Sequence, residues 1–483
     1  MSVNSVSGRD EATEREALSW LDDPFEHFGW STTRIHSVPR EELAAVQLAG
    51  INIKLEQRRG QIKVLEKLAD AQGITSCADL DAAAPLLLPH NVYKSYPVSL
   101  LSKQRFDKLT DWLARLTPHD LSQVDPSGCT SIDEWLTRIQ SDTPLDVATS
   151  SGSSGTLSFY PKSKRDYWLT TQGMRVQLVQ RFGTEPTEAD LEEKIHVVLP
   201  MHRDGHALAG RTGQYLKHVF GKGDEDFYHT CFDFKASTDL MWLAARVRAA
   251  AAKGDMSQVD ATPQLLARRA EWEEQQRKMP DQMRAFIERI IDELSGERVF
   301  AMGTTTLFLP LAMRGAEQGA RAAFAPGSLV SGGGGAKGIV LPDNYEQIIC
   351  DFFGVERFEQ TYGMTEMNSL SRMCEHGRYH LMPWVVPYLL DLENGTPLPR
   401  TGVRTGRAAF LDLTHDGTWG GIVTGDLATI DWDGHCACGR TSIAIERSVQ
   451  RLSELQGGDD KITCAAQPAA QAEAMDFLLN LEG

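Results

Sequence analysis

Six hydroxyl side chains and two glycines stand together in one short segment: Thr149, Ser150, Ser151, Gly152, Ser153, Ser154, Gly155 and Thr156. Apolar, β-prone residues flank the segment, Val147 before it and residues 157–160 after it, which predicts a strand, a tight loop and a second strand. Converging amides and hydroxyls bind anions such as phosphate, and glycines let the backbone approach a ligand closely. The segment therefore predicts a phosphate-binding loop, with a flexible Ser/Gly linker as the alternative.

Two carboxylates stand close to the ends of predicted strands. The run Arg357 to Tyr362 predicts a strand, and Thr365 and Glu366 follow it closely. A carboxylate beside a threonine hydroxyl suits a hard cation such as Mg²⁺ held against a polyphosphate. The run Gly421 to Leu427 predicts another strand, which ends in a glycine turn and Asp426. A carboxylate in that position can accept two hydrogen bonds from the vicinal hydroxyls of a ribose.

The run Ser331 to Gly338 is rich in glycine and includes Gly333 and Gly334. From Gly333 on, its spacing formally satisfies the Gly-x-Gly-x-x-Gly dinucleotide pattern, and Glu356 lies at about the distance of a ribose partner. Only Leu329 and Val330 could form the preceding strand, which speaks against a nicotinamide cofactor. Close approach of another ligand to the backbone is the interpretation we favour.

A separate set of residues has the composition of a zinc site. Cys374 and His380 follow the segment of Glu366, and Cys436 and Cys438 lie together further along the chain. Three cysteines and a histidine are a standard tetrahedral set for structural Zn²⁺. Such a site would hold the segment of Glu366 against the strand of Asp426. The alternative is two pairs of reduced, partly buried thiols.

Composition excludes several classes of protein. The net charge is −17, from 49 basic and 66 acidic residues, which argues against a nucleic-acid partner. No apolar run approaches the ~20 residues that cross a bilayer, and the N-terminus has no apolar signal region. Eight cysteines in 483 residues suit a reducing compartment better than a disulfide framework. We therefore expect a cytoplasmic protein without a membrane partner.

Hydrophobic spacing indicates helices and buried strands along the chain. Residues 1–145 are predicted to be mainly helical, with apolar positions three and four residues apart in stretches such as Pro39 to Leu68. Residues 236–295 predict a charged layer of helices. The runs Ile195 to Pro200 and Val299 to Leu309 predict buried strands. A chain of this length can hold two or three domains, or one large one with additions.

Three of the motifs occur in a fixed order: Ser-Ser-Gly-Ser-Ser-Gly, Gln-Thr-Tyr-Gly-Met-Thr-Glu and Thr-Gly-Asp. This ordered set resembles the adenylate-forming superfamily of acyl-CoA synthetases and adenylation domains, over residues 90–465. Within the superfamily the chain looks most similar to phenylacetate-CoA ligase-like proteins and acyl-protein synthetases. The phrase Cys-Ala-Cys-Gly-Arg-Thr at residues 436–441 is similar to the Cys-Pro-Cys-Gly-Arg-Thr of the former.

The resemblance implies a fold and a division of the chain. The fold would be α/β, with a large N-terminal adenylation domain of mixed sheets flanked by helices. Residues 1–145 would be the mainly helical first part of that domain, and residues 146–455 its ATP- and acid-binding core. Residues 456–483 would be a hinge and the remnant of a C-terminal lid domain that is largely missing.

The resemblance also implies roles near the phosphates of ATP. The segment from Ser150 to Thr156 would bind the β- and γ-phosphates. Thr365 and Glu366 would contact the α-phosphate and Mg²⁺. Arg440 or Arg451 would lie near the end of the nucleotide site, and Arg440 is the catalytic candidate of the two. Lys162 lies further from the loop glycines than the lysine of many relatives, so it receives no phosphate role.

The nucleoside and the acid would lie against other residues. By resemblance, Tyr362 and Gly363 would lie against adenine, and Asp426 would hold the ribose. Gly333 and Gly334 occupy the place where the family lines the adenine and acyl pockets. The Gly-Ala-Glu-Pro phrase common near adenine is replaced here by glycines, which predicts a pocket of different shape.

The implied activity is ATP-dependent activation of a carboxylic acid. The acid would form an acyl- or aryl-adenylate with release of pyrophosphate, for transfer to CoA, a carrier protein or an amine. Catalysis of this kind is mostly positioning and charge stabilisation, and it needs no side-chain nucleophile. The alternative is a non-catalytic or partner-dependent protein of the same fold.

The C-terminal segment departs from the family. Gly457 to Ile462 resembles the hinge phrase, but only 21 residues follow Ile462, too few for a domain with its own core. They contain no lysine, whereas relatives carry a lysine there that completes adenylation. We therefore expect a partner protein or a homodimer neighbour to supply the missing cover, or slow reaction in an open site.

Overall fold

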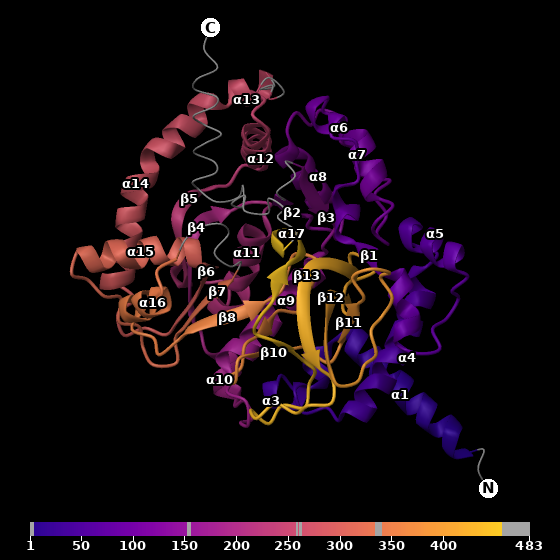
Figure 1. Cartoon of the computed structure of the whole chain (residues 1–483). Helices are drawn as coiled ribbons and strands as arrows, with labels where there is room; N and C mark the ends of the chain where they lie inside the picture. Colours follow the sequence, from indigo (N-terminus) through magenta and orange to yellow (C-terminus); the bar gives the residue numbers. More distant parts are fainter. Residues whose placement is uncertain (1–3, 152–155, 257–258, 260–262, 334–340, 456–483) are drawn as a thin grey trace.

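The computed structural model describes residues 4–151, 156–256, 259, 263–333 and 341–455 (Figure 1). The chain is a mixed α/β protein with a six-stranded sheet, a seven-stranded sheet and a two-stranded hairpin. Helices flank the sheets, which confirms the expected α/β class with mixed sheets and flanking helices (Figure 1). The predicted hinge and lid remnant at 456–483 lie outside the described residues.

Helices dominate residues 4–145, as the apolar spacing predicts. The apolar stretch from Pro39 to Leu68 forms two helices, which a turn at residues 59–61 that contains Gly60 separates. The elements of this part are α1 (Asn4–Asp22), α2 (Pro24–His27), α3 (Thr32–Ile35), α4 (Arg40–Arg58), α5 (Lys63–Gln72), η1 (Asp81–Leu86), β1 (Leu88–Pro89), η2 (His90–Lys94), α6 (Ser99–Ser102), α7 (Phe106–Leu113) and α8 (Ile132–Asp142).

The six-stranded sheet has the order β5-β4-β6-β7-β8-β9. The first five strands are parallel, and β9 pairs antiparallel with β8 at the edge. Carboxyl ends of parallel strands therefore gather at one edge, which is where open α/β sheets bind ligands. The strands are β4 (His196–Asp204), β5 (Tyr228–Lys235), β6 (Val299–Thr304), β7 (Leu329–Gly333), β8 (Phe358–Tyr362) and β9 (Ser371–Arg372).

The predicted strand from Val299 to Leu309 ends earlier than expected. Strand β6 stops at Thr304, and helix α15 (Thr305–Glu317) begins at the next residue. Phe308 and Leu309 are buried, but on the helix and not on the strand. An apolar run of this length does not distinguish a buried strand from a buried helix by periodicity, so the sequence could not place the boundary.

Side chains of the six-stranded sheet alternate between two hydrophobic cores. On β4, Val198 packs into one core, whereas Val197 and Leu199 pack into the other, as the two-residue period of a strand requires. Both faces are therefore covered by helices (Figure 1). The helices are α9 (Lys164–Val179) and α11 (Leu208–Gly221) on one face, and α14 (Arg269–Asp292), α15 and α16 (Tyr345–Phe353) on the other.

The seven-stranded sheet is formed mainly by the C-terminal third of the chain. Its central order is β10-β14-β13-β12-β11, and β1 and β15 both pair with β13. Helices α1 and α4 pack against it, since Trp20 and Leu43 share a core with Phe410 (Figure 1). The strands are β10 (Arg378–His380), β11 (Val385–Leu390), β12 (Val403–Asp412), β13 (Gly421–Asp431), β14 (Ala444–Glu446) and β15 (Gln450–Arg451).

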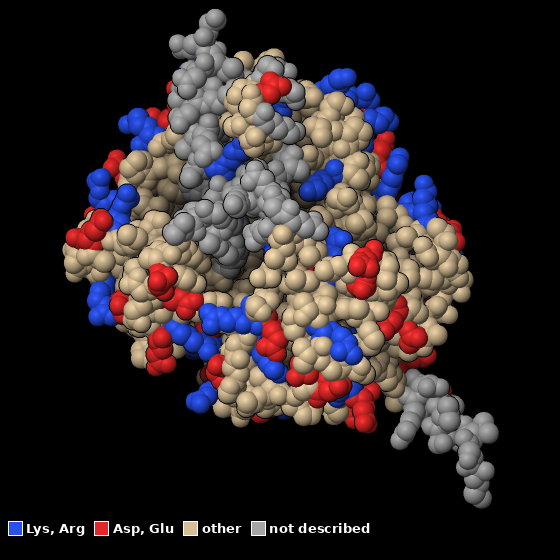
Figure 2. All heavy atoms as spheres, viewed as in Figure 1, with Lys and Arg blue, Asp and Glu red and all other residues tan. Residues whose placement is uncertain are grey.

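A fourth core lies beneath the hairpin of β2 (Ala148–Ser151) and β3 (Leu157–Tyr160), where Phe159 packs with Trp135 and Trp242. The remaining elements are α10 (Glu188–Glu192), η3 (Glu225–Phe227), α12 (Thr238–Lys253), α13 (Pro263–Ala267) and α17 (Leu452–Leu455). Among the described helices, none is both long and apolar enough to cross a membrane. On the described part of the face in Figure 2, acidic and basic side chains are interspersed.

Candidate functional site

The two strands predicted on either side of the hydroxyl-rich segment are present. Strands β2 and β3 pair antiparallel, with Thr149 opposite Phe159, Ser150 opposite Ser158 and Ser151 opposite Leu157. The tip of the loop, Gly152, Ser153, Ser154 and Gly155, lies outside the described residues, and Thr156 is half-buried beside it. Strand pairing describes only the residues on either side of the tip, so phosphate binding by the tip stays a prediction, with a Ser/Gly linker as its alternative.

The second and third motifs meet across the two sheets. Tyr362, the last residue of β8, donates a hydrogen bond of 2.9 Å from its hydroxyl to Oδ2 of Asp426 on β13. Arg451 on β15 pairs with the other oxygen, Oδ1, at 3.1 Å. Burial, together with the charge of Asp426, raises the pKa of Tyr362 well above its usual value, so the phenol stays protonated and remains a donor.

The segment after β8 is fixed from two sides. The main-chain carbonyl of Glu366 accepts a hydrogen bond from the Tyr160 hydroxyl at 3.2 Å, and it lies 3.0 Å from Nε2 of His415. Tyr160 ends β3, so the strand that follows the first motif touches the second motif. Gly363 is required for packing, because a Cβ there would lie 2.1 Å from Cδ2 of Leu370. Thr365 is half-buried in the same segment.

Three positive charges act on the Glu366 carboxylate. Burial raises the pKa of this carboxyl, and Arg451, Lys162 and Lys94 oppose the rise. The three cations come from β15, the segment after β3, and η2, which are distant in sequence. A desolvated carboxylate next to several cations is poised to take part in a site that binds further charged groups.

A buried polar network beneath this segment was not found by sequence reasoning. The Nζ of Lys162 donates to Oδ1 of Asn368 at 2.6 Å, and Nδ2 of Asn368 donates to Oδ1 of Asp166 at 2.7 Å. Asp166 also accepts from the amides of Asp416 and Gly417, at 2.8 and 2.9 Å. Helix α9, the segment after β8 and the β12–β13 turn are therefore joined by hydrogen bonds.

The charges in this network are mutually compensated. Burial alone would raise the pKa of Asp166, but the nearby imidazole of His415, together with the charge of Lys162, holds it well below its usual value. Burial lowers the pKa of Lys162, which the charges of Asp166 and Asp412 oppose. Lys162 thus holds the segment that follows β8 in place. Apart from its closeness to the hairpin, no motif in the sequence indicated this position.

The glycine run begins at the carboxyl edge of the parallel sheet. Gly333 ends β7 and pairs with Thr304 at the end of β6, while Gly334 lies outside the described residues. An apolar cavity of about 200 Å³ lies at this edge. Its lining includes Met174, Met201, Leu208, Phe300, Met302 and Leu370. Thr361 also lines the cavity. Because Thr361 precedes Tyr362, the cavity lies next to the tyrosine that bonds to Asp426.

Arg440 lies away from the pair of Asp426 and Arg451. Its guanidinium stacks over the ring of Phe182 at 4.4 Å from the centroid, and its Nη1 lies 3.6 Å from Oε2 of Glu375. Of the two arginines considered from the sequence, Arg451 is therefore the one in contact with Asp426. The catalytic role assigned to Arg440 stays a prediction.

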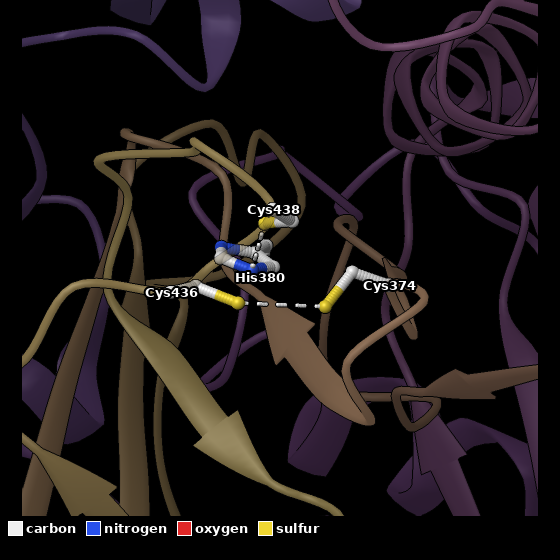
Figure 3. Close-up of side chains that lie close together, drawn as sticks. All are labelled: Cys374, His380, Cys436 and Cys438. Atoms are coloured by element: carbon white, nitrogen blue, oxygen red, sulfur yellow. Dashed lines mark hydrogen bonds between the residues drawn. The ribbon is translucent and has the colours of Figure 1, made fainter.

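The four predicted zinc ligands come together in one cluster (Figure 3). One ligand atom from each of Cys374, His380, Cys436 and Cys438 lies within 4.8 Å of the others. Figure 3 shows the side chains converging from the segment after β9, the end of β10 and the connection between β13 and β14. Cys374, His380 and Cys436 are buried, and Cys438 is partly buried.

No protein-family model and no curated protein matches the sequence. Among solved structures, the chain is similar to an open conformation of 2-hydroxyisobutyryl-CoA ligase in complex with 2-HIB-AMP and CoA, at 11% identity and a TM-score of 0.46, covering 86% of this chain and 76% of that one. The same ligase in the postadenylation state with R3-HIB-AMP gives 10% identity and a TM-score of 0.48, covering 86% and 69%. Apo MatB from Rhodopseudomonas palustris gives 14% identity and a TM-score of 0.32, covering 62% and 47%.

Proposed function

We propose that the chain activates a carboxylic acid with ATP, forming an acyl-adenylate and pyrophosphate. The observation that carries this proposal is the convergence of three motifs that are far apart in sequence. Tyr160 of the hairpin binds the carbonyl of Glu366, and Tyr362 binds the carboxylate of Asp426. A phosphate loop, a carboxylate beside a threonine and a ribose-type carboxylate in one place are the parts that nucleotide activation of an acid requires.

Asp426 would accept hydrogen bonds from the ribose hydroxyls of ATP. In the structure each of its oxygens has one protein partner, so ribose hydroxyls would either add to these bonds or displace one of the partners. The Arg451 side chain is 55% exposed, whereas that of Asp426 is 6% exposed. Because Arg451 approaches from the exposed side, ribose hydroxyls could take its place at Oδ1 without leaving this buried oxygen unpaired, while Tyr362 keeps Oδ2 in place.

The residues present also fit a magnesium ion. Mg²⁺ in nucleotide sites is bound through one or two protein oxygens plus substrate phosphates. Glu366 and Thr365 would supply those protein oxygens, and the burial that raises the pKa of Glu366 indicates a carboxylate that gains from added positive charge. When bound, the ion would neutralise charge on the phosphates of ATP. The chain itself orients the segment of Glu366 through Tyr160 and His415.

In the proposed reaction, a carboxylate oxygen of the acid attacks the α-phosphorus of ATP, and the bond to the β-phosphate oxygen breaks. Pyrophosphate carries away the electron pair, and no proton transfer to a side chain is needed. The amides and hydroxyls of the hairpin loop would hold the leaving phosphates, and Lys162 and Lys94 supply fixed positive charge near Glu366. The protein therefore contributes alignment and electrostatics.

The apolar cavity would receive the organic part of the acid. Its volume of about 200 Å³ is below the range of roughly 300–1,000 Å³ typical of pockets for drug-sized ligands. Its lining combines methionine, leucine and phenylalanine side chains with polar ones that include Gln177 and Arg372, and methionine adapts readily to irregular shapes. We therefore infer a compact, uncharged acyl or aryl group, passed on to CoA, a carrier protein or an amine.

ATP–pyrophosphate exchange with a panel of acids tests the proposal. We expect exchange with small apolar acids, such as short branched or aromatic ones, and little exchange with dicarboxylic or amino acids. No exchange with any acid, combined with no ATP binding in titration calorimetry, would favour a non-catalytic protein. ATP binding without exchange would instead favour a protein that needs a partner, and exchange should then appear when the partner is added.

A further inference from the structure

The Cys/His cluster has the spacing of a metal-bound set. The Sγ atoms of Cys374 and Cys436 are 3.7 Å apart, and Sγ of Cys438 is 3.3 Å from Nε2 of His380. In a tetrahedral zinc site with Zn–S bonds of about 2.3 Å and a Zn–N bond of about 2.0 Å, two sulfurs lie about 3.8 Å apart, and a sulfur and a nitrogen about 3.5 Å. Both distances therefore agree with the edges of one tetrahedron.

The alternatives fit less well. A disulfide brings its sulfurs to about 2.05 Å, far closer than Cys374 and Cys436 lie. Free thiols are weak hydrogen-bond donors, so three of them gathered around one imidazole gain little from one another. From these distances we propose that Cys374, His380, Cys436 and Cys438 bind one structural Zn²⁺ ion. Cys₃His is a closed ligand set, which favours structure over catalysis.

A hydrogen-bonded chain behind His380 selects the nitrogen that would bind the metal. Nδ1 of His380 lies 3.1 Å from Oγ of Ser442, and the same Oγ lies 2.9 Å from Nδ1 of His36. The serine hydroxyl has one proton, so it accepts from one ring and donates to the other. With Nε2 of His380 on zinc, its Nδ1–H donates to Ser442, which in turn donates to His36. Ser442 and His36 are thus positioning residues that fix the ring, as partners behind metal ligands do.

The location of the site gives the metal a structural role. Cys374 follows β9, and β9 pairs with the end of β8, with Ser371 opposite Tyr362. Cys436 and Cys438 lie in the connection that follows β13, the strand of Asp426. A zinc ion would therefore tie the two segments that carry Tyr362 and Asp426, and it would hold them at a fixed separation. This role is independent of whether the protein activates an acid.

Metal analysis of the full-length protein, purified without chelator, tests the proposal. We expect about one zinc per chain by mass spectrometry. We also expect a fall in the melting temperature after zinc removal with a chelator, and recovery when zinc is added. Cobalt replacement should give the intense absorption of tetrahedral, thiolate-bound Co²⁺. Far less than one zinc per chain, together with an unchanged melting temperature when zinc is added, would overturn the site, as would another metal at one per chain.

Variants separate ligation from general stability. Cys436→Ser and Cys438→Ser should lose the zinc, whereas Cys350→Ser, a change at a buried cysteine outside the cluster, should retain it. Ser442→Ala should weaken zinc affinity about 10–100-fold in chelator competition, and Ser442→Thr, which keeps the hydroxyl, should restore it. If the ligand variants do not fold, the competition assay on the Ser442 pair decides, and equal affinities for both would contradict the proposed arrangement.

Discussion

The Tyr362 hydroxyl donates to Oδ2 of Asp426 at 2.9 Å, and this bond joins the end of β8 to the middle of β13. Because β8 belongs to the six-stranded sheet and β13 to the seven-stranded one, the bond spans the two halves of the candidate site. It leaves the outer oxygen, Oδ1, to the exposed Arg451. We therefore expect Tyr362 to hold the Asp426 side chain in position. Arg451 is expected to occupy the oxygen, Oδ1, that the ribose of a nucleotide would contact.

Substitutions of Asp426 and Tyr362 should have different effects, the first mainly on ATP affinity and the second on the free energy of unfolding. Asp426→Ala should weaken ATP binding at least tenfold, about 1.4 kcal/mol, because the ribose partner is lost. Tyr362→Phe keeps the ring but leaves a buried carboxylate oxygen without its donor, which should lower the free energy of unfolding by about 1–3 kcal/mol. ATP affinity by calorimetry and denaturant unfolding measure the two effects.

Asp281 offers the matched control for this pair, since its side chain is 78% exposed on α14. Asp281→Ala should change neither ATP affinity nor stability measurably. If Asp426→Ala binds ATP as the wild type does, Asp426 is not the ribose partner, and its bond to Tyr362 is purely structural.

Glu366→Gln should reduce the exchange rate about 100-fold or more, while ATP affinity changes less. The substitution keeps the size of the side chain but removes the charge that would hold Mg²⁺, and electrostatic contacts of this kind typically contribute factors of 10²–10³. Exchange measured over a range of Mg²⁺ concentrations should show a higher requirement in the variant. Glu393→Gln, at an exposed position, is the control, and equal rates in all three proteins would remove Glu366 from the site.

Motif order and apolar periodicity together predicted the frame of the site. The strands around residue 150 and the strand that ends at Tyr362 lie where the sequence indicated. The strand of Asp426 also forms, but it continues to Asp431, so the turn predicted at Gly425 and Asp426 is wrong and Asp426 lies within the strand. The four zinc candidates also lie together in the structure. They could be selected from the sequence because cysteine and histidine are uncommon and are typical zinc ligands. The roles of these residues toward ATP or metal remain predictions.

Contacts that depend on tertiary packing could not be predicted in the same way. Lys162, Asn368 and Asp166 carry no spacing signal, since their bonds join residues about two hundred positions apart. The choice between Arg440 and Arg451 likewise depends on the pairing of β15 with β13, which no local pattern encodes. The end of β6 was misplaced because its apolar run continues into α15.

The buried Lys54 should make the free energy of unfolding depend on pH. Its Nζ is buried and donates to the carbonyls of Leu413 and His415, at 2.9 and 2.7 Å. Burial lowers its pKa from 10.5 to about 7, although the charge of Asp412 opposes the shift. Between these values the unfolded chain keeps a proton that the native chain has lost, so this group makes stability rise with pH, by up to about 1.4 kcal/mol per pH unit.

Denaturant unfolding of wild type and Lys54→Met at pH 7, 8 and 9 measures this contribution. The difference in unfolding free energy, wild type minus variant, should increase with pH, because methionine does not titrate. Lys63→Met, at a lysine whose side chain is 60% exposed, should give a difference that does not change with pH. A constant difference for Lys54→Met as well would show that Lys54 keeps its proton over this range.

A substitution at Gly417 tests whether the hairpin is packed tightly against the β12–β13 turn. A Cβ at this position would lie 1.9 Å from the carbonyl oxygen of Pro161 and 2.9 Å from Oδ2 of Asp166. The first contact is with the main chain just after β3, which cannot rotate away, so Gly417→Ala must push the hairpin from the turn. The variant should lose about 1–3 kcal/mol or more of unfolding free energy. Gly60→Ala, where nothing lies within 4 Å, should stay within about 0.5 kcal/mol of wild type.

Because moving the hairpin also separates Tyr160 from Glu366, exchange activity of the folded Gly417→Ala fraction should fall. Full stability and activity in Gly417→Ala would show that the hairpin is not held against the turn.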